Sequence, residues 1–194
     1  MHGQLAQNMI AIMSSLLATE LSRLGEREQA LAAGDVLFRA GDPIFSLFLV
    51  ISGALLLTRS LPHGSELVLQ RAGPGAVLAE ASLFAESYHC DAIAAQPSVL
   101  CVLPRLRIEA ALASDPELAR AMTRHLAQEV QRTRAAAEIL SLKTVTERVT
   151  AWMALNDGGL PPRGRWRNVA AEIGITPEAF YRELARRRSK GKGA

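Results

Sequence analysis

Three charged residues near the C-terminus, Glu178, Arg182 and Arg186, recur every four residues and would share one face of a helix. Arginine can donate two hydrogen bonds to guanine and glutamate can accept from cytosine, so such a face could read base edges in a DNA major groove. The apolar residues of the segment would face a core instead: Phe180, Leu184 and Ala185. A purely structural interpretation stays open, because the helix dipole alone favours acids in the first turn and bases in the last.

Residues 169–188 predict the elements that would position this face. They form the pattern of a short helix, a glycine turn at Gly174 and a second helix opened by Thr176 and Pro177, which is helix-turn-helix spacing. Thr176 can cap free amide groups, and Pro177 suits the first helical position, where no amide donor is needed. Paired short helices also occur in proteins that never contact DNA, so the motif alone leaves DNA recognition open.

Charge is spread unevenly over the 194 residues, whose formal net charge is +3. Residues 141–194 carry eleven Lys and Arg against five Asp and Glu, a net charge of +6, which leaves −3 on the rest. A basic block on a mildly acidic body is typical of a module that meets phosphates. The block lacks the broad apolar face of a helix that binds a membrane surface, so we expect double-stranded DNA as its partner. The expected phosphate contacts are Arg165, Arg167, Arg186 and Lys190.

Composition narrows the class of protein. No apolar run reaches the roughly 18 residues of a membrane span, and the amphipathic residues 1–28 predict a helix of a soluble protein rather than a signal peptide. Cys90 and Cys101 offer neither a disulfide framework nor metal-ligand spacing, which indicates a reduced, cytoplasmic setting and no metal site. Without a Ser/His/Asp arrangement or a phosphate-binding loop, we do not expect an enzyme.

Short apolar segments separated by Gly and Pro fill the chain from Leu31 to Pro104. Turns about every ten residues predict a compact antiparallel barrel or roll. The expected strand segments are 36–38, 46–53, 54–60, 66–72, 92–95 and 98–103.

Helical patterning follows, with one long helix expected from residue 115 to residue 140 and another from 144 to 156. Apolar residues of the long helix form a stripe at spacings of three and four: Leu118, Met122, Leu126, Val130, Thr133, Ala137 and Leu140. Such a stripe can pack on its own domain or pair with a second copy of the chain.

Three segments occur in a fixed order: the glycine-punctuated stretch 33–53, AEASLFAESYHCDA at 79–92, and GITPEAFYREL at 174–184. They resemble, in turn, the opening of a cyclic-nucleotide-binding roll, a phosphate-binding cassette and a recognition helix. From residue 31 to residue 188 the chain thus resembles the Crp/Fnr family of bacterial transcription regulators.

The resemblance implies an α+β fold: an N-terminal β-roll of the cyclic-nucleotide-binding type (an antiparallel double-stranded jelly roll), a long dimerisation helix and a C-terminal helix-turn-helix. The expected domains are a sensor domain of residues 1–114, a dimerisation helix of 115–140 and a DNA-binding domain of 141–194 that lacks a full wing. It also implies a homodimeric transcription regulator that binds DNA and contacts RNA polymerase. The recognition-helix residues would be Thr176, Glu178 and Arg182.

The cassette departs from the pattern of cyclic-nucleotide binders. Glu80 fits the glutamate that binds the ribose hydroxyl, but the place of the phosphate-binding Arg falls at Cys90 and that of the next hydroxyl at Asp91. A buried phosphate without an Arg partner is strongly disfavoured, so we expect no tight binding of cyclic AMP. The candidate ligand-binding residues are Glu80, Ala81, Ser82, Leu83, Cys90, Asp91 and Thr133.

Other cofactors of such sensors fit the sequence no better. An iron–sulfur cluster needs about four cysteines, and the chain has two. His89 beside Cys90 is a conceivable pair of haem ligands, although such a pair more often has a structural role. The effector therefore stays unassigned.

Two departures concern DNA binding. Pro177 stands where the cyclic AMP receptor has an Arg that reads guanine, and residues 189–194 are too short for a wing, although they could contact phosphates as a disordered arm. The alternative function is a ligand-binding regulatory module that docks a protein partner without sequence-specific DNA binding.

Overall fold

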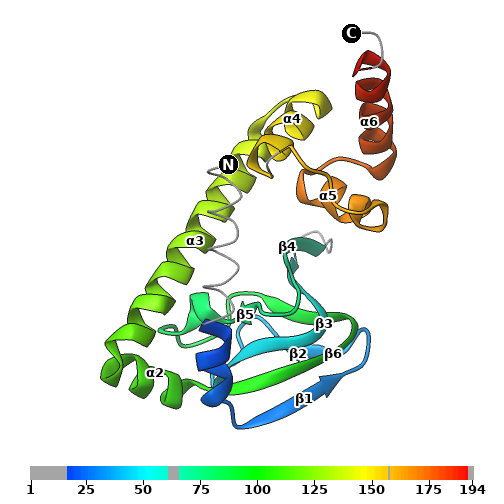
Figure 1. The fold of residues 1–194 in the computed structure, drawn as a ribbon. Helices are drawn as coiled ribbons and strands as arrows, with labels where there is room; N and C mark the ends of the chain where they lie inside the picture. Colours follow the sequence, from blue (N-terminus) through cyan, green and yellow to red (C-terminus); the bar gives the residue numbers. More distant parts are fainter. Residues whose placement is uncertain (1–16, 61–65, 157, 192–194) are drawn as a thin grey trace. The chain divides into compact units, whose positions relative to one another are not determined.

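The computed structural model describes residues 17–60, 66–156 and 158–191, without the side chains of the last two residues (Figure 1). The chain forms two compact units that meet within helix α3 (Pro116–Ser141). The first unit ends at Leu126 and the second begins at Ala127.

Among the described residues, the first unit contains an antiparallel sheet of six strands in the order β1-β6-β3-β4, with β2 also paired to β6 and β5 to β3. This confirms the predicted antiparallel roll. The strands are β1 (Arg27–Leu31), β2 (Val36–Phe38), β3 (Ser46–Ser60), β4 (Glu66–Ala72), β5 (Val77–Leu78) and β6 (Asp91–Pro104).

Two long strands, β3 and β6, pair along most of their length, from Ser46 opposite Pro104 to Thr58 opposite Asp91. The predicted breaks after residues 53 and 95 are wrong. The segments 46–53 and 54–60 form one continuous strand, β3, and the segments 92–95 and 98–103 form another, β6. Gly53 lies in a stretch of shifted register with φ of 89°, where a Cβ atom would lie 2.5 Å from the carbonyl oxygen of Pro97. A glycine that permits a close backbone approach marks a bulge here rather than a turn.

The prediction of one helix over residues 1–28 is wrong at its C-terminal end. Residues 17–23 are helical, residues 1–16 lie outside the described part of the chain, and β1 begins at Arg27. β1 pairs with β6, with Arg27 opposite Val102. Because β1 is an edge strand with mostly exposed side chains, its sequence lacks the apolar alternation that predicts a strand.

Alternate residues of β3 are buried on opposite faces of the sheet. Phe48 and Val50 belong to the core inside the roll, whereas Leu47 and Leu49 belong to a second core outside it. Helical residues complete that second core: Leu17 and Leu21, Ile108 of α2 (Arg105–Ser114), and Leu118 and Met122 of α3.

The predicted stripe along α3 divides at the boundary between the units. Leu118 and Met122 are buried and Leu126 is partly buried on the first unit. In the second unit Val130 and Thr133 are exposed, as are Ala137 and Leu140. Only the first half of the stripe therefore packs within its own unit.

The second unit is helical among its described residues. Its elements after α3 are α4 (Val145–Leu155), the 3-10 turn η2 (Arg163–Arg165), α5 (Trp166–Glu172) and α6 (Pro177–Gly191). α4 starts at a capping box, in which Thr144 Oγ1 accepts a hydrogen bond from the Glu147 amide and the Glu147 carboxylate accepts one from the Thr144 amide. These elements confirm the predicted helix over 144–156 and the helix-turn-helix.

Two details of α6 differ from the sequence-based expectations. Phe180 and Leu184 are buried as expected, but Ala185 is exposed because it lies on the side of α6 away from the core. α6 also continues to Gly191, so residues 189–191 are helical rather than the start of a disordered arm. Its interior from Glu178 to Lys190 contains no Gly or Pro that would end it.

The turn at Gly174 joins α5 to α6 with φ of 64°, in the left-handed region. The guanidinium of Arg148 on α4 holds this turn, because its Nη1 donates to the carbonyl oxygens of Ile173 (3.1 Å) and Gly174 (2.9 Å). The same guanidinium donates to the end of α3, at the carbonyl oxygens of Leu140 (3.0 Å) and Leu142 (2.9 Å). One arginine thus ties three helices together at their ends.

Substitution of Gly174 by Ala is expected to destabilise the second unit by about 1–2 kcal/mol, the cost of a left-handed conformation for a residue with a Cβ atom. The added atom would lie 2.8 Å from Leu140 Cδ2 and 3.0 Å from Arg148 Nη1. Both tryptophans, Trp152 and Trp166, lie in this unit, so urea unfolding followed by their fluorescence measures it selectively. Gly164→Ala is the control, because nothing lies within 4 Å of its Cβ position. Equal stability of the two variants would contradict the assignment.

Candidate functional site

The exposed face of α6 carries Glu178 and Arg182. Both lie opposite Phe180 and Leu184, which are buried on the core of the unit, because successive residues of a helix turn by about 100°. Neither charged side chain forms an ion pair with any described residue. Thr176 caps this helix, its Oγ1 accepting a hydrogen bond from the Ala179 amide at 3.2 Å. The face is therefore presented to solvent with its hydrogen-bonding groups available.

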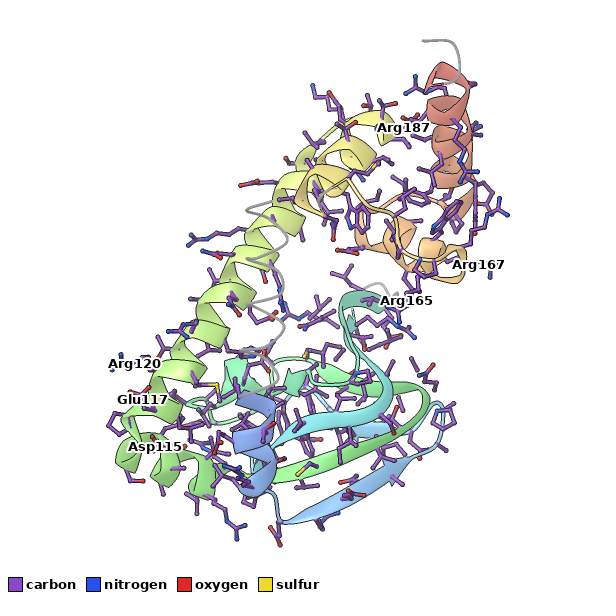
Figure 2. The ribbon with its side chains drawn as sticks, viewed as in Figure 1. Asp115, Glu117, Arg120, Arg165, Arg167 and Arg187 are labelled. Carbon is purple, nitrogen blue, oxygen red and sulfur yellow. The ribbon has the colours of Figure 1, made fainter. Side chains whose placement is uncertain are left out.

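Two of the basic residues expected to meet phosphates, Arg165 and Arg167, lie at the start of α5. Arg165 is the last residue of η2 and Arg167 lies in the first turn of the helix (Figure 2). Both are exposed, and neither is paired with an acidic residue of the described chain. Lys190 belongs to the last turn of α6, and its side chain lies outside the described atoms.

Arg186 is placed differently from what its spacing predicts. Its guanidinium forms two parallel hydrogen bonds with the carboxylate of Glu183, from Nε to Oε2 (2.8 Å) and from Nη2 to Oε1 (2.7 Å). Glu183 also accepts from Arg187 Nε (2.8 Å) and from Thr146 Oγ1 (3.1 Å) on α4. Arg186 thus belongs to an internal network rather than to the face of Glu178 and Arg182.

Arg187 fastens the same network to α4 (Figure 2). Its Nη2 donates to the carbonyl oxygen of Thr146 (2.9 Å) and to Thr150 Oγ1 (2.6 Å). The sequence places Glu183, Arg186 and Arg187 at the spacings of helical ion pairs, but the charge pattern alone does not show that Glu183 is 6% exposed. Sequence reasoning therefore missed this network.

Glu183 is ionised throughout the physiological pH range. The hydrogen bonds from Arg186, together with those from Arg187 and Thr146, lower the pKa of its carboxyl to about 2 against the opposing effect of burial. A carboxylate with a pKa below its unfolded value stabilises the fold above the unfolded pKa, and this stabilisation is lost as the pH falls through the folded pKa.

Replacing Glu183 by Gln is expected to destabilise the second unit by about 1.5–3 kcal/mol at pH 7, the usual worth of hydrogen bonds to a charged group. In the native protein this contribution should decline from about pH 4.5 toward pH 2, so wild type and variant converge in acid. Thermal unfolding by tryptophan fluorescence across that window measures the difference. Glu178→Gln, on the exposed face of the same helix, is the control and should change little. A Glu183→Gln difference that stays constant with pH would contradict the network's role.

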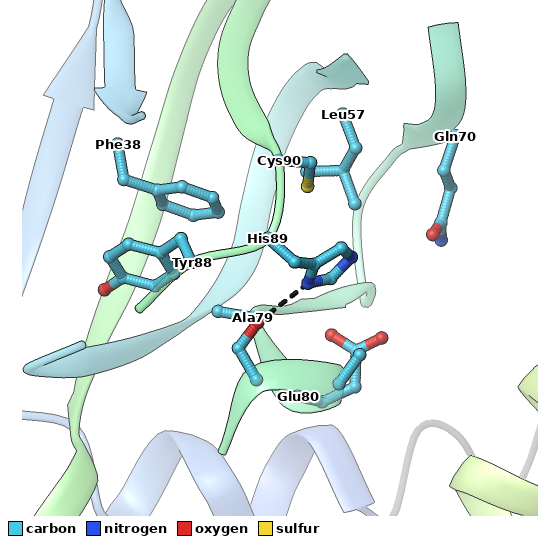
Figure 3. Close-up of a pocket in the computed structure, with 10 residues that line it drawn as sticks. Phe38, Leu57, Gln70, Ala79, Glu80, Tyr88, His89 and Cys90 are labelled. Atoms are coloured by element: carbon cyan, nitrogen blue, oxygen red, sulfur yellow. Dashed lines mark hydrogen bonds between the residues drawn. The ribbon is translucent and has the colours of Figure 1, made fainter. Parts of the chain in front are cut away.

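In the first unit, ten residues line a small pocket of about 60 Å³ inside the roll (Figure 3). Two of them, Ser82 and His89, are joined by a hydrogen bond of 2.8 Å between Ser82 Oγ and His89 Nδ1. The lining residues are Phe38, Leu57, Gln70, Ala79, Glu80, Ala81, Ser82, Tyr88, His89 and Cys90. The cassette segment 79–92 therefore brings four of the expected ligand residues to this pocket, namely Glu80, Ala81, Ser82 and Cys90.

The other expected ligand residues have different surroundings. Leu83 is buried in the core outside the roll. Asp91 Oδ1 accepts a hydrogen bond from the Ala40 amide at 2.7 Å, so its carboxylate holds the loop before β3. Thr133 is exposed on α3 in the second unit.

Aromatic side chains fill much of the space inside the roll. The rings of Phe38 and Tyr88 stack with centroids 3.9 Å apart, and Tyr88 Oη donates to the Ser46 carbonyl oxygen at 2.8 Å. Pockets for drug-sized ligands typically enclose about 300–1,000 Å³. The cavity of about 60 Å³ has no arginine among its lining residues that could pair with a cyclic phosphate.

Cys90 is buried in this pocket. Burial raises the pKa of its thiol; nearby Arg59 lowers it, whereas Asp91 and Glu80 raise it further. The thiol is therefore protonated at neutral pH, which disfavours metal ligation and nucleophilic chemistry. Among the described residues no three His, Cys, Asp or Glu side chains gather where they could hold a metal ion.

Cyclic AMP is expected to show no binding at micromolar concentrations in calorimetric titration of the purified protein. The physical reason is the absence of an arginine at Cys90 together with the stacked rings of Phe38 and Tyr88. Micromolar affinity would contradict this prediction and would require the pocket to open around the nucleotide.

Comparison with known proteins identifies the family that the first unit matches. Residues 28–115 match the family model described as the cyclic nucleotide-binding domain. The transcriptional activator protein Anr of Pseudomonas aeruginosa is 28% identical over 152 residues, which make up 78% of this chain and 61% of that protein. Electron transport regulator A of Shewanella oneidensis is 25% identical over 195 residues, 94% of this chain and 78% of that protein. The chain thus spans less than two thirds of the length of Anr.

Solved structures share the fold. FixK2 from Bradyrhizobium japonicum superposes with a TM-score of 0.67 at 22% identity, covering 85% of each chain. The catabolite activator protein of Thermus thermophilus superposes with a TM-score of 0.55 at 27% identity, covering 90% of this chain and 84% of that one. No helix in the described parts of the chain is long and apolar enough to cross a membrane. Residues 28–115 thus match the cyclic nucleotide-binding domain family, and the chain is similar in sequence to regulators of the Crp/Fnr type and shares the fold of FixK2.

Proposed function

We propose that the protein is a DNA-binding transcription regulator of the Crp/Fnr type that inserts α6 into the major groove. The observation that carries this proposal is the exposed, unpaired face of Glu178 and Arg182, opposite the buried face of the same helix. A helix held by its apolar side and fixed at its start by the Gly174 turn can present such a face to base edges. The relatives named as transcriptional activators support the same function.

We assign a distinct role to each charged residue. Glu178 and Arg182 read bases, and Arg165 and Arg167 contact phosphates beside them, as does Lys190 at the far end of α6. Arg186 is paired with Glu183 but its side chain remains 42% exposed, so a phosphate contact by Arg186 remains part of the proposal. Pro177 begins α6 and has no side-chain donor, so no base contact is assigned to it.

A homodimer is the second part of the proposal. Beyond Leu126, α3 exposes Val130 (48%) and Ala137 at helical spacing, together with Thr133 between them. Pairing this exposed half of the stripe with its copy would bury it and place two α6 helices on two half-sites. Residues 115–140 would thus serve as the dimerisation helix between a sensor domain (1–114) and a DNA-binding domain (141–194), in a cytoplasmic protein that contacts RNA polymerase.

Selection of genomic DNA fragments on the purified protein at near-physiological salt tests the proposal. Enrichment of a palindrome with half-sites about ten base pairs apart is the expected result. Binding without any sequence preference would contradict it and would favour a regulatory module that docks a protein partner.

Substitution of Arg182 by Ala is expected to cost about 1–3 kcal/mol at the selected site and to relax one base position. Random DNA of the same length should be bound almost as well as by wild type, because Arg182 contributes mainly to base recognition. Fluorescence anisotropy with both duplexes measures the two affinities. Arg120→Ala, which removes an exposed arginine paired with Glu117 on α3, is the control (Figure 2). Equal losses on both duplexes would exclude base reading by Arg182.

A further inference from the structure

Two arginines from distant parts of the sequence converge on one aromatic ring in the second unit. The guanidinium carbon of Arg163 in η2 lies 5.5 Å from the centroid of Trp166, and that of Arg188 in α6 lies 5.6 Å from it. Both distances are within the range of cation–π attraction. Neither arginine is among the phosphate contacts that the sequence predicts.

The Trp166 ring is itself firmly held. The residue is 5% exposed, and its Nε1 donates to the Pro161 carbonyl oxygen at 2.8 Å. Its ring meets Phe180 edge-on at 6.2 Å and lies 5.5 Å from the half-exposed ring of Tyr181. Trp166 is therefore a fixed platform that joins η2, α5 and α6.

The two guanidinium groups remain available to a ligand. Arg163 and Arg188 are exposed, and within the described residues neither forms an ion pair or a hydrogen bond through its side chain. Contact with a ring uses the face of a guanidinium and leaves the N–H groups at its edge free to donate. The contrast with Arg186 and Arg187, both bound to Glu183, separates two kinds of arginine on one helix.

The position of Arg188 on α6 relates this platform to the base-reading face. At about 100° per residue, Arg188 and Tyr181 lie on one strip of the helix, next to the strip of Glu178 and Arg182. Arg163 belongs to the same basic run as Arg165 and Arg167. Cations thus border the base-reading face where a duplex in contact with that face presents its phosphates.

We propose that Arg163 and Arg188, oriented by the ring of Trp166, form a clamp for phosphates of the DNA backbone beside the α6 face. The clamp rests on the proposed function and extends it, because it assigns backbone affinity to two residues that read no base. Its ligand is the phosphodiester, so its contribution is independent of sequence and sensitive to salt.

Anisotropy titrations of a specific and a random duplex over a series of salt concentrations test the clamp. Arg163→Gln and Arg188→Gln should each weaken both duplexes by the same factor and reduce the slope of log K against log salt by about one. Arg27→Gln, an exposed arginine of β1 in the first unit, is the matched control and should leave affinity and slope unchanged. Thermal unfolding of each variant checks that the fold is retained.

Lysine variants test the role of the ring. Arg163→Lys and Arg188→Lys keep the charge but lose the planar group that lies against Trp166. We expect them to keep the wild-type salt slope and to bind both duplexes more weakly than wild type does. Lysine variants that bind as tightly as wild type would overturn the positioning role of Trp166.

The outcomes separate the clamp from the proposed function. If wild type binds a selected site and both Gln variants keep its affinity and slope, the clamp is wrong and the proposed function stands. If a Gln variant loses affinity only for the specific duplex, that residue reads bases and the clamp is equally wrong. If wild type binds no duplex at any salt concentration, both proposals fall together.

Discussion

The orientation of α6 depends on one buried carboxylate. Glu183 receives hydrogen bonds from Arg186 and Arg187 on its own helix and from Thr146 on α4, and the pKa of its carboxyl falls to about 2 as a result. An ion in this position is tolerated only because each of its oxygens is paired. The network fixes one side of α6 against α4, while Phe180 fixes another side on the core. What remains facing outward is the face of Glu178 and Arg182.

The arginines of α6 show how one residue type acquires different roles from its helical position. Arg182 faces solvent opposite the core, Arg186 and Arg187 pair with Glu183, and Arg188 lies over the ring of Trp166. Each step along the helix turns the side chain by about 100°, so neighbours in sequence meet different surroundings. A basic run therefore gives the net charge available to DNA, whereas the packing of the helix decides which of those charges reach it.

The two units differ in the functional groups that they make available to a ligand. In the first unit, Phe38 stacks on Tyr88 and His89 is hydrogen-bonded to Ser82 around the small pocket. The small pocket and the protonated Cys90 give this roll little capacity for a large anionic ligand. In the second unit, Glu178 and Arg182 are exposed on α6, and the buried Glu183 on the same helix is paired with Arg186 and Arg187. The features that support function thus concentrate in the helical unit.

Local patterns were enough to predict much of the architecture, because short apolar strands, the break-free helix from residue 116 and the Gly174 turn are encoded by neighbouring residues. The candidate face of Glu178 and Arg182 followed from helical spacing alone. The edge strand β1 and the bulge at Gly53 did not, since they depend on β6 and Ser98, which are distant in sequence. The pairing of Arg186 with Glu183 did not either, because Glu183 is buried against Thr146 of α4. Neighbouring residues specify which elements form and which charges those elements carry. Which of these charges pair with a buried partner and which stay exposed depends on how the elements pack, because burial is a property of packed elements.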